Sequence, residues 1–141
     1  MNFAILIANT DQEINSCFSV FKELRPTLNY QEFLPQVRRQ ESQSYQIIAI
    51  RQHGEIKSVA GFRFCEFFAW GKVLYIDDLA TLSSDRGHGY ASSLLAWLIE
   101  YAKTEGCKGV HLDSGYARHA AHRLYLQKGF RLSGHHLSLE F

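Results

Sequence analysis

The feature that most constrains this chain of 141 residues is a glycine-containing turn at residues 84–91 (SDRGHGYA). An apolar, β-rich segment precedes the turn at residues 73–82, and leucines at helical spacing follow it in residues 92–102. This pattern predicts a junction between a strand and a helix. The first turn of a helix has unpaired N–H groups and the positive end of the helix dipole, and glycine lets an anion approach the backbone. We therefore expect residues 86–92 to bind the pyrophosphate of a cofactor.

Composition excludes several classes of function. The chain carries 15 basic and 14 acidic side chains without a run of like charge, which argues against a nucleic-acid partner. Its apolar runs are too short to span a membrane, and its N-terminus lacks the features of a signal peptide. We expect a soluble, cytoplasmic protein with a single domain over residues 1–141 and no membrane partner. Cys17, Cys65 and Cys107 are odd in number and form no C-x-x-C pair, so we expect reduced thiols rather than disulfides or a zinc site.

The remaining pattern predicts a mixed α+β fold in the order β-α-α-β-β-β-α-β-α-β-β. Strands are expected at residues 2–8, 45–52, 56–70, 73–82, 109–114, 130–131 and 137–141, and helices at 13–24, 29–40, from the glycine turn to about 103, and at 117–128. His53 and Gly54 predict a hairpin, and Gly61 inside a strand suggests a β-bulge. The strands on either side of the long helix are joined by a crossover, so we expect them to be parallel.

Two common nucleotide-binding motifs do not match the glycine turn. A dinucleotide fingerprint needs a third glycine where Ser92 stands, and no acidic residue closes a second strand about twenty residues later. A P-loop needs a G-K-[ST] sequence, which the chain lacks. The turn therefore points to another phosphate-containing cofactor, or to a simple connection between a strand and a helix.

Two motifs resemble one known family. Arg86-x-x-Gly89-x-Ala91 resembles the Q/R-x-x-G-x-G/A acyl-CoA signature of the GNAT superfamily of N-acetyltransferases. Residues 124–130 (LYLQKGF) resemble the downstream L-Y-x-x-x-G-F element of the same superfamily, and the predicted order of strands and helices matches it over essentially the whole chain. The sequence departs from the pattern at Arg118, where many members have Asn.

The resemblance implies an enzyme that transfers an acetyl group from acetyl-CoA to a primary amine of a small molecule or peptide. The attack is direct, in a ternary complex, without a metal, and a homodimer is left open. The family fold also implies a mostly antiparallel sheet that is splayed at the cofactor site. The residues expected to bind the cofactor, through the pantetheine arm or the pyrophosphate, are Leu79, Ala80, Thr81, Leu82, Arg86, Gly87, His88, Gly89, Tyr90, Ala91 and Ser92.

Acetyl transfer from a thioester to an amine requires two proton transfers. By the resemblance, Tyr125 matches the tyrosine that protonates the departing thiolate, although an aromatic ring packed against Leu124 and Phe130 is the structural alternative. Asp77 and Asp78 are the candidates for the base, and the alternation of a strand predicts that they face opposite sides. Two carboxylates in an apolar strand indicate either a polar cleft, which we favour, or an ion pair.

The acceptor site is expected between residues 25 and 44 and along the aromatic strand at residues 62–70. Its candidate side chains are Tyr30, Glu66, Phe68 and Trp70. Glu66 is also a third candidate for the base, or a solvent-facing residue of an alternating strand.

Two pairs of histidines raise the possibility of a metal site. His119-x-x-His122 and His135-His136 lack the further ligands of a metal site, so we expect none. A non-catalytic module of the same fold that binds or senses acyl-CoA is the alternative to an enzyme. A domain that binds a partner and no cofactor is a third hypothesis.

Overall fold

The computed structural model describes residues 3–115 and 118–141. The chain divides into two compact units, Met1–His111 and Leu112–Phe141. The predicted starts of the first strand at Asn2 and of the last helix at Ala117 lie outside the described residues. A single domain over the whole chain stays a prediction.

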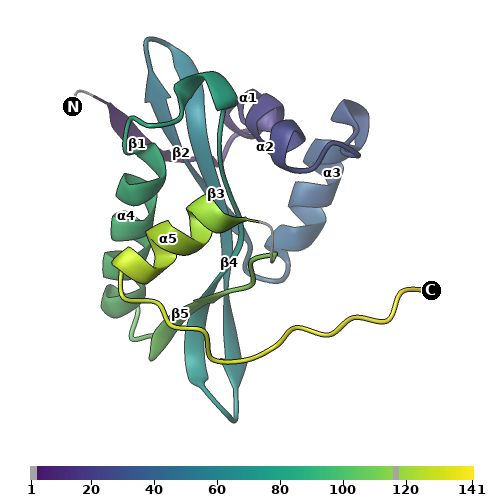
Figure 1. Cartoon of the computed structure of the whole chain (residues 1–141). Helices are drawn as coiled ribbons and strands as arrows, with labels where there is room; N and C mark the ends of the chain where they lie inside the picture. Colours follow the sequence, from purple (N-terminus) through teal and green to yellow (C-terminus); the bar gives the residue numbers. More distant parts are fainter. Residues whose placement is uncertain (1–2, 116–117) are drawn as a thin grey trace. The chain divides into compact units, whose positions relative to one another are not determined.

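The elements follow the predicted order as far as the last helix (Figure 1). They are β1 (Ala4–Ile7), α1 (Asp11–Ser16), α2 (Phe18–Leu24), α3 (Tyr30–Glu41), β2 (Gln46–Gln52), β3 (Glu55–Phe67), β4 (Gly71–Thr81), a 3₁₀ turn (Ser83–Asp85), α4 (Tyr90–Thr104), β5 (Gly109–Leu112) and α5 (His119–Gln127). The first predicted helix is divided at Cys17, which ends α1 and precedes α2. Thr10 and Glu13 form a reciprocal cap at the start of α1.

The sheet has the order β1-β2-β3-β4-β5, and its first four strands are antiparallel. His53 and Gly54 both have positive φ, 54° and 77°, as a tight two-residue hairpin requires. The N–H of Lys108 donates to the carbonyl of Lys72 at 2.7 Å, which joins the starts of β5 and β4. The two strands therefore run parallel, as the crossover through α4 predicts.

Helices cover both faces of the sheet (Figure 1). The helices α1, α2 and α3 lie on one face, over a core that includes Ile14, Val20, Phe33 and Ile47. On the other face, Phe62 of β3 contacts the aromatic rings of Trp97 and Tyr101 on α4, with centroids 6.3 and 6.0 Å apart. The amphipathic stripe predicted for α4 is confirmed, since Leu94, Leu95, Leu98 and Ala102 are buried.

The two strands predicted at residues 130–131 and 137–141 are wrong, because the structure assigns neither. Leu137, Leu139 and Phe141 alternate as in a strand, yet their side chains are exposed. Alternation alone does not form a strand, since the backbone groups need a paired neighbour, and none is formed here. In the described part of the chain, no helix has both the length and the apolarity to cross a membrane.

Candidate active site

An irregularity in the register of β3 and β4 brings two carboxylates together. Gly61 pairs with Asp78 and Phe62 pairs with Ile76, so Asp77 is an extra residue on β4. The bulge suggested by Gly61 is confirmed, although the inserted residue belongs to the partner strand. A bulge interrupts the alternation of side chains. The prediction that Asp77 and Asp78 face opposite sides is therefore wrong, and both line one cavity.

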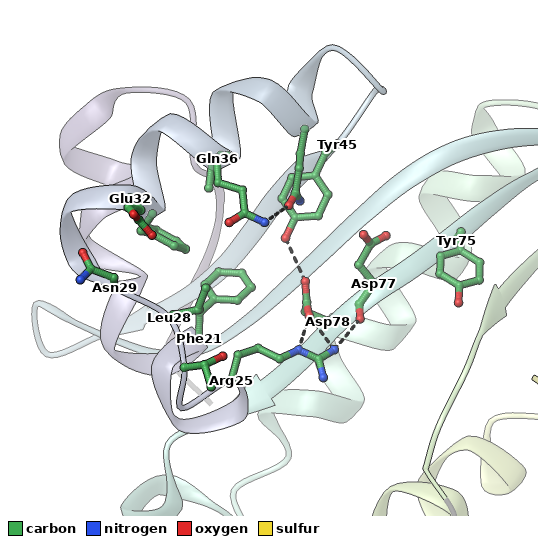
Figure 2. A pocket seen from close by; sticks show the side chains of 14 residues that line it. Phe21, Arg25, Leu28, Asn29, Glu32, Gln36, Tyr45, Tyr75, Asp77 and Asp78 are labelled. Carbon is green, nitrogen blue, oxygen red and sulfur yellow. Dashed lines mark hydrogen bonds and ion pairs between the residues drawn. The ribbon is translucent and has the colours of Figure 1, made fainter. Parts of the chain in front are cut away.

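This cavity has a volume of about 590 Å³ and lies between α2, α3 and β4 (Figure 2). Its lining combines aromatic, amide and charged side chains from distant parts of the sequence. The lining residues are Phe21, Arg25, Thr27, Leu28, Asn29, Glu32, Phe33, Gln36, Val37, Gln40, Tyr45, Tyr75, Asp77 and Asp78. A cavity of this volume is within the usual range for small-molecule sites.

Asp78 has partners on both of its oxygens (Figure 2). Arg25, the residue that ends α2, donates to Oδ1 of Asp78 from Nε at 3.1 Å and from Nη2 at 2.9 Å. The hydroxyl of Tyr45 donates to Oδ2 at 3.2 Å. The Arg25 side chain is half exposed, whereas that of Asp78 is largely covered. Arg25 is thus a charge partner that solvent, or a ligand in the cavity, can reach.

Asp77 is paired separately, with Arg63 of β3. Nε of Arg63 donates to Oδ1 of Asp77 at 3.0 Å, and Nη2 donates to Oδ2. Arg63 also donates to the amide oxygen of Gln43 at 2.7 Å. Burial raises the pKa of Asp77, and the guanidinium of Arg63 lowers it in part. The two alternatives for these carboxylates are both found, because they line a polar cavity and form ion pairs.

Tyr45 reaches Asp78 because residue 61 has no side chain. A Cβ placed on Gly61 would lie 1.8 Å from the hydroxyl oxygen of Tyr45. The tyrosine is only 4% exposed, and the guanidinium of Arg63 lies 5.3 Å from its ring centroid. Burial, followed by the charge of Asp78, raises the pKa of Tyr45 well above its usual value. The phenol therefore keeps its proton and remains a hydrogen-bond donor to Asp78.

The glycine turn has the geometry expected of an anion site. Gly87 and Gly89 have φ of 85° and 80°, a region that favours glycine. Gly89 caps α4, and no side chain accepts from its first N–H groups and no acidic residue lies in the first turn. These N–H donors suit a phosphate, whose oxygens would accept their hydrogen bonds. The Tyr90 side chain is buried and bonded to Gln52, so only its backbone could contribute.

The other predicted cofactor residues lie on both sides of this turn. Arg86 and His88 are exposed, and Nδ1 of His88 is 3.0 Å from the carbonyl oxygen of Asp85. Ala80 and Leu82 pack against the core under α1, α2 and α3. A contact between residues 79–82 and a pantetheine arm stays a prediction.

The predicted acceptor residues do not line the cavity. Tyr30, at the start of α3, is half exposed and contacts the ring of Phe18. Glu66 is exposed near the end of β3, and Phe68 is fully exposed in the turn that follows. Trp70 stacks on His111, with centroids 4.3 Å apart. A role for these four residues in binding the acceptor therefore stays a prediction without support from the cavity.

Tyr125 belongs to the second unit, on α5. Its ring lies 5.7 Å from that of Phe130, and its carbonyl accepts from the N–H of Phe130 at 3.0 Å. The ring of Tyr125 thus packs on Phe130 of the same motif, as the structural alternative predicts. Burial raises the pKa of Tyr125, with Arg118 opposing the shift, so the phenol is protonated at neutral pH. Arg118 itself caps α5 without a side-chain hydrogen bond.

Sequence reasoning missed several residues of the cavity. Arg25 was placed at the start of the segment expected to hold the acceptor but was given no partner, and Tyr45 was interpreted only as the start of a strand. Arg63, which pairs with Asp77, offered a usable signal, because a charged residue between Phe62 and Phe64 needs a partner. All three cysteines are free. Among residues 3–115 and 118–141, no three His, Cys, Asp or Glu side chains are grouped as metal ligands would be.

The chain is similar to known proteins over most of its length. The family model described as acetyltransferase (GNAT) family matches residues 8–130. An uncharacterized N-acetyltransferase, YhdJ, of Bacillus subtilis is 29% identical over 126 residues, which are 88% of this chain and 89% of that protein.

Two solved structures are similar over nearly the whole chain. The structure of a transcriptional regulator from Bacillus halodurans has a TM-score of 0.84 at 26% identity, and the match covers 99% of this chain and 100% of that chain. AAC(6')-Iy in complex with the bisubstrate analogue CoA-S-monomethyl-acetylneamine also has a TM-score of 0.84, at 14% identity, covering 100% and 99% of the two chains. The latter likeness shows a shared fold alone.

Proposed function

Because the chain belongs to the acetyltransferase (GNAT) family, we propose that it transfers the acetyl group of acetyl-CoA to a primary amine held in the cavity of Figure 2. The acceptor is a small molecule or a peptide, and the attack is direct, in a ternary complex. The observation that carries this proposal is the bulge at Asp77, because it places the carboxylates of Asp77 and Asp78 in the same cavity. Both residues lie on β4, the strand that leads to the glycine turn.

The chain's own donors suit the binding of acetyl-CoA, which supplies the acetyl group as an activated thioester. N–H groups of residues 87–92 would hold its pyrophosphate at the start of α4, where no side chain caps them. Arg86, exposed beside the turn, adds a positive charge. The backbone of residues 79–82, at the end of β4, would hold the pantetheine arm.

A base must act first, because an ammonium nitrogen has no lone pair with which to attack. Asp77 or Asp78 takes one proton from the acceptor ammonium, directly or through water. The nitrogen then forms a bond to the acetyl carbon as the carbon–sulfur bond breaks, and it loses a second proton to become the amide. That second proton replaces the one that the acid gives to the departing sulfur. Asp77 is the better suited of the two, because burial raises its pKa towards the range in which a carboxylate is an effective base.

An acid completes the exchange of protons. The sulfur leaves as a thiolate, and Tyr125 would donate the proton that makes it free CoA. This assignment rests on the motif at residues 124–130, and the raised pKa of Tyr125 keeps the phenol proton available. No covalent acetyl-enzyme is required, in keeping with Cys17, whose burial raises the pKa of its thiol to about 12.

Two measurements together test the proposed function. A specific ligand at a hundred times its dissociation constant stabilises a protein by about 2.7 kcal/mol, so acetyl-CoA should raise the melting temperature by several degrees. A panel of primary amines should then release free thiol in the presence of acetyl-CoA. A thermal shift without thiol release from any amine would support the rival acyl-CoA sensor, and no shift at millimolar acetyl-CoA would remove both.

A further inference from the structure

We infer that the acceptor carries a second positive charge, remote from the amine that is acetylated, and that Glu32 binds it. This inference rests on the proposed function and names the class of acceptor. Glu32 lies on α3, which forms a different wall of the cavity from β4 with Asp77 and Asp78 (Figure 2). A cation against Glu32 would leave the other end of the acceptor free to reach the carboxylates.

The charges that line the cavity are not balanced within it. Its charged lining residues are Arg25, Glu32, Asp77 and Asp78. Asp78 is paired with Arg25, and Asp77 is paired with Arg63. Within the described part of the chain, no cation is paired with Glu32. Glu32 is therefore the carboxylate of this cavity that no cationic side chain neutralises, and only the positive end of the α3 dipole lies beside it.

The sequence around Glu32 explains why it has no partner. On a helix, ion pairs form between residues three or four apart. At these spacings from Glu32 stand Leu28, Asn29, Pro35 and Gln36, none of which is charged. The basic residue Arg38 is one turn too far along α3, and its contacts are with Asp11 and Glu41.

The neighbours of Glu32 on the same wall are amides. Gln36 and Gln40 follow it at intervals of four, and the amide nitrogen of Gln36 donates to the oxygen of Gln40 at 2.9 Å. Asn29 accepts from the N–H of Gln31 at 2.9 Å, so its oxygen is already used in capping α3. This wall thus offers one full charge, which is negative, and neutral polar groups around it.

The size of the cavity also favours an acceptor with two ends. Its volume of about 590 Å³ is many times the roughly 10–15 Å³ that a cavity needs to hold one water molecule. A simple short monoamine at Asp77 would leave most of the α3 wall in contact with water. A molecule long enough to touch both walls, with an ammonium at each end, would meet a carboxylate at each.

The experiment compares three acceptors of equal chain length: hexamethylenediamine, hexylamine and aminocaproate. Thiol release with acetyl-CoA is measured for the wild type and for Glu32→Gln. The variant should raise KM for the diamine about fivefold, the upper range for an exposed ion pair, with kcat nearly unchanged and hexylamine unaffected. The difference between wild type and variant should shrink at high salt, because salt screens exposed charges. Diamines from propyl to octyl locate the best length.

Three further variants make the result decisive. Glu41→Gln removes the same charge from the same helix outside the cavity, so it should leave the KM of the diamine unchanged. Glu32→Lys should reverse the preference, favouring aminocaproate over the diamine. A rise in the KM of the diamine in Glu66→Gln, with none in Glu32→Gln, would place the second charge at Glu66 and overturn the inference.

The outcomes also separate the inference from the proposed function. Thiol release from amines together with an unchanged diamine KM in Glu32→Gln would overturn the inference alone. No thiol release from any amine would overturn the proposed function, and the inference with it.

Discussion

The glycine turn and the cavity on β4 are built in opposite ways. The turn, at residues 86–92, is one continuous segment whose available groups are backbone N–H donors, set by Gly87 and Gly89 in the left-handed region. The cavity is assembled from side chains of α2, α3 and β4 and from Tyr45, which precedes β2, and Arg63 of β3 pairs with one of its carboxylates. A backbone site depends on few side chains, so it can stay the same while a side-chain site changes.

This difference is consistent with two binding tasks, one for the cosubstrate and one for the acceptor. The turn suits a cosubstrate that is always the same, because a phosphate needs only donors and a helix dipole. The cavity suits the selection of one acceptor among many amines, because the charges of Glu32, Arg25 and the two aspartates lie at fixed positions. A substitution confined to the turn or to the cavity should therefore affect the binding of one substrate and leave that of the other unchanged.

Tyr125→Phe should reduce amine-dependent thiol release about 100-fold or more, the loss expected when a general acid is removed. The affinity for acetyl-CoA, measured by thermal shift, should remain. The substitution removes one oxygen from a buried ring that packs on Phe130, so the fold should persist. Unchanged turnover would show that Tyr125 only packs within its own unit and has no part in catalysis.

Gly61→Ala should impair the cavity and leave the turn intact. The new Cβ would lie 1.8 Å from the Tyr45 hydroxyl, so the ring must move and its bond to Asp78 is lost. Overpacking of this kind costs about 1–3 kcal/mol, and we expect kcat/KM for the acceptor to fall about tenfold or more. Gly134→Ala, in open space with ordinary φ, is the matched control. A rise in the KM of acetyl-CoA would contradict the separation.

Gly87→Ala should have the converse effect. Nothing lies within 4 Å of a Cβ at this position, so the change introduces backbone strain without a clash. The left-handed conformation costs a residue other than glycine roughly 1–2 kcal/mol, and we expect the KM of acetyl-CoA to rise about tenfold. The KM of the acceptor should stay within error. If both KM values rose together, the two regions would be coupled.

Arg63→Met should move the acid limb of the pH profile for kcat/KM. A base must be deprotonated to act, so activity is lost as the pH falls through its pKa. Burial raises the pKa of Asp77 and Arg63 partly offsets this, so loss of the guanidinium should shift the limb to higher pH. Arg63→Lys should shift it less. An unmoved limb in Arg63→Met, with a change in Arg25→Met, would identify Asp78 as the base.

Arg118→Asn should give the smallest effect, a gain in stability. Arg118 caps α5 without a side-chain hydrogen bond, whereas Asn is among the best N-cap residues. The gain should be about 1 kcal/mol, or a few degrees in melting temperature. Arg118→Ala removes the same charge without supplying a cap and should bring no such gain. Equal melting temperatures for the two variants would exclude capping as the cause.

The features that residue patterns predicted correctly are those that depend on local interactions. Glycine at residues 87 and 89, the leucine stripe after them and the His53-Gly54 hairpin follow from backbone preferences and from periodicity over a few residues, and the structure confirms all three. The motifs at residues 86–91 and 124–130 likewise pointed to the family that the comparisons support.

The cavity beside β4, in contrast, depends on tertiary contacts that no local pattern predicts. The extra residue at Asp77 depends on how β4 pairs with β3, so alternation along β4 alone predicted the wrong face for one carboxylate. Arg25 and Tyr45 are 53 and 33 residues away from Asp78 in sequence, and no local pattern brings them to it. The prediction of strands at residues 130–131 and 137–141 was wrong for the same reason, because a strand needs a paired neighbour as well as alternating residues. Sequence periodicity reports local geometry, while pairing and charge balance are properties of the folded chain.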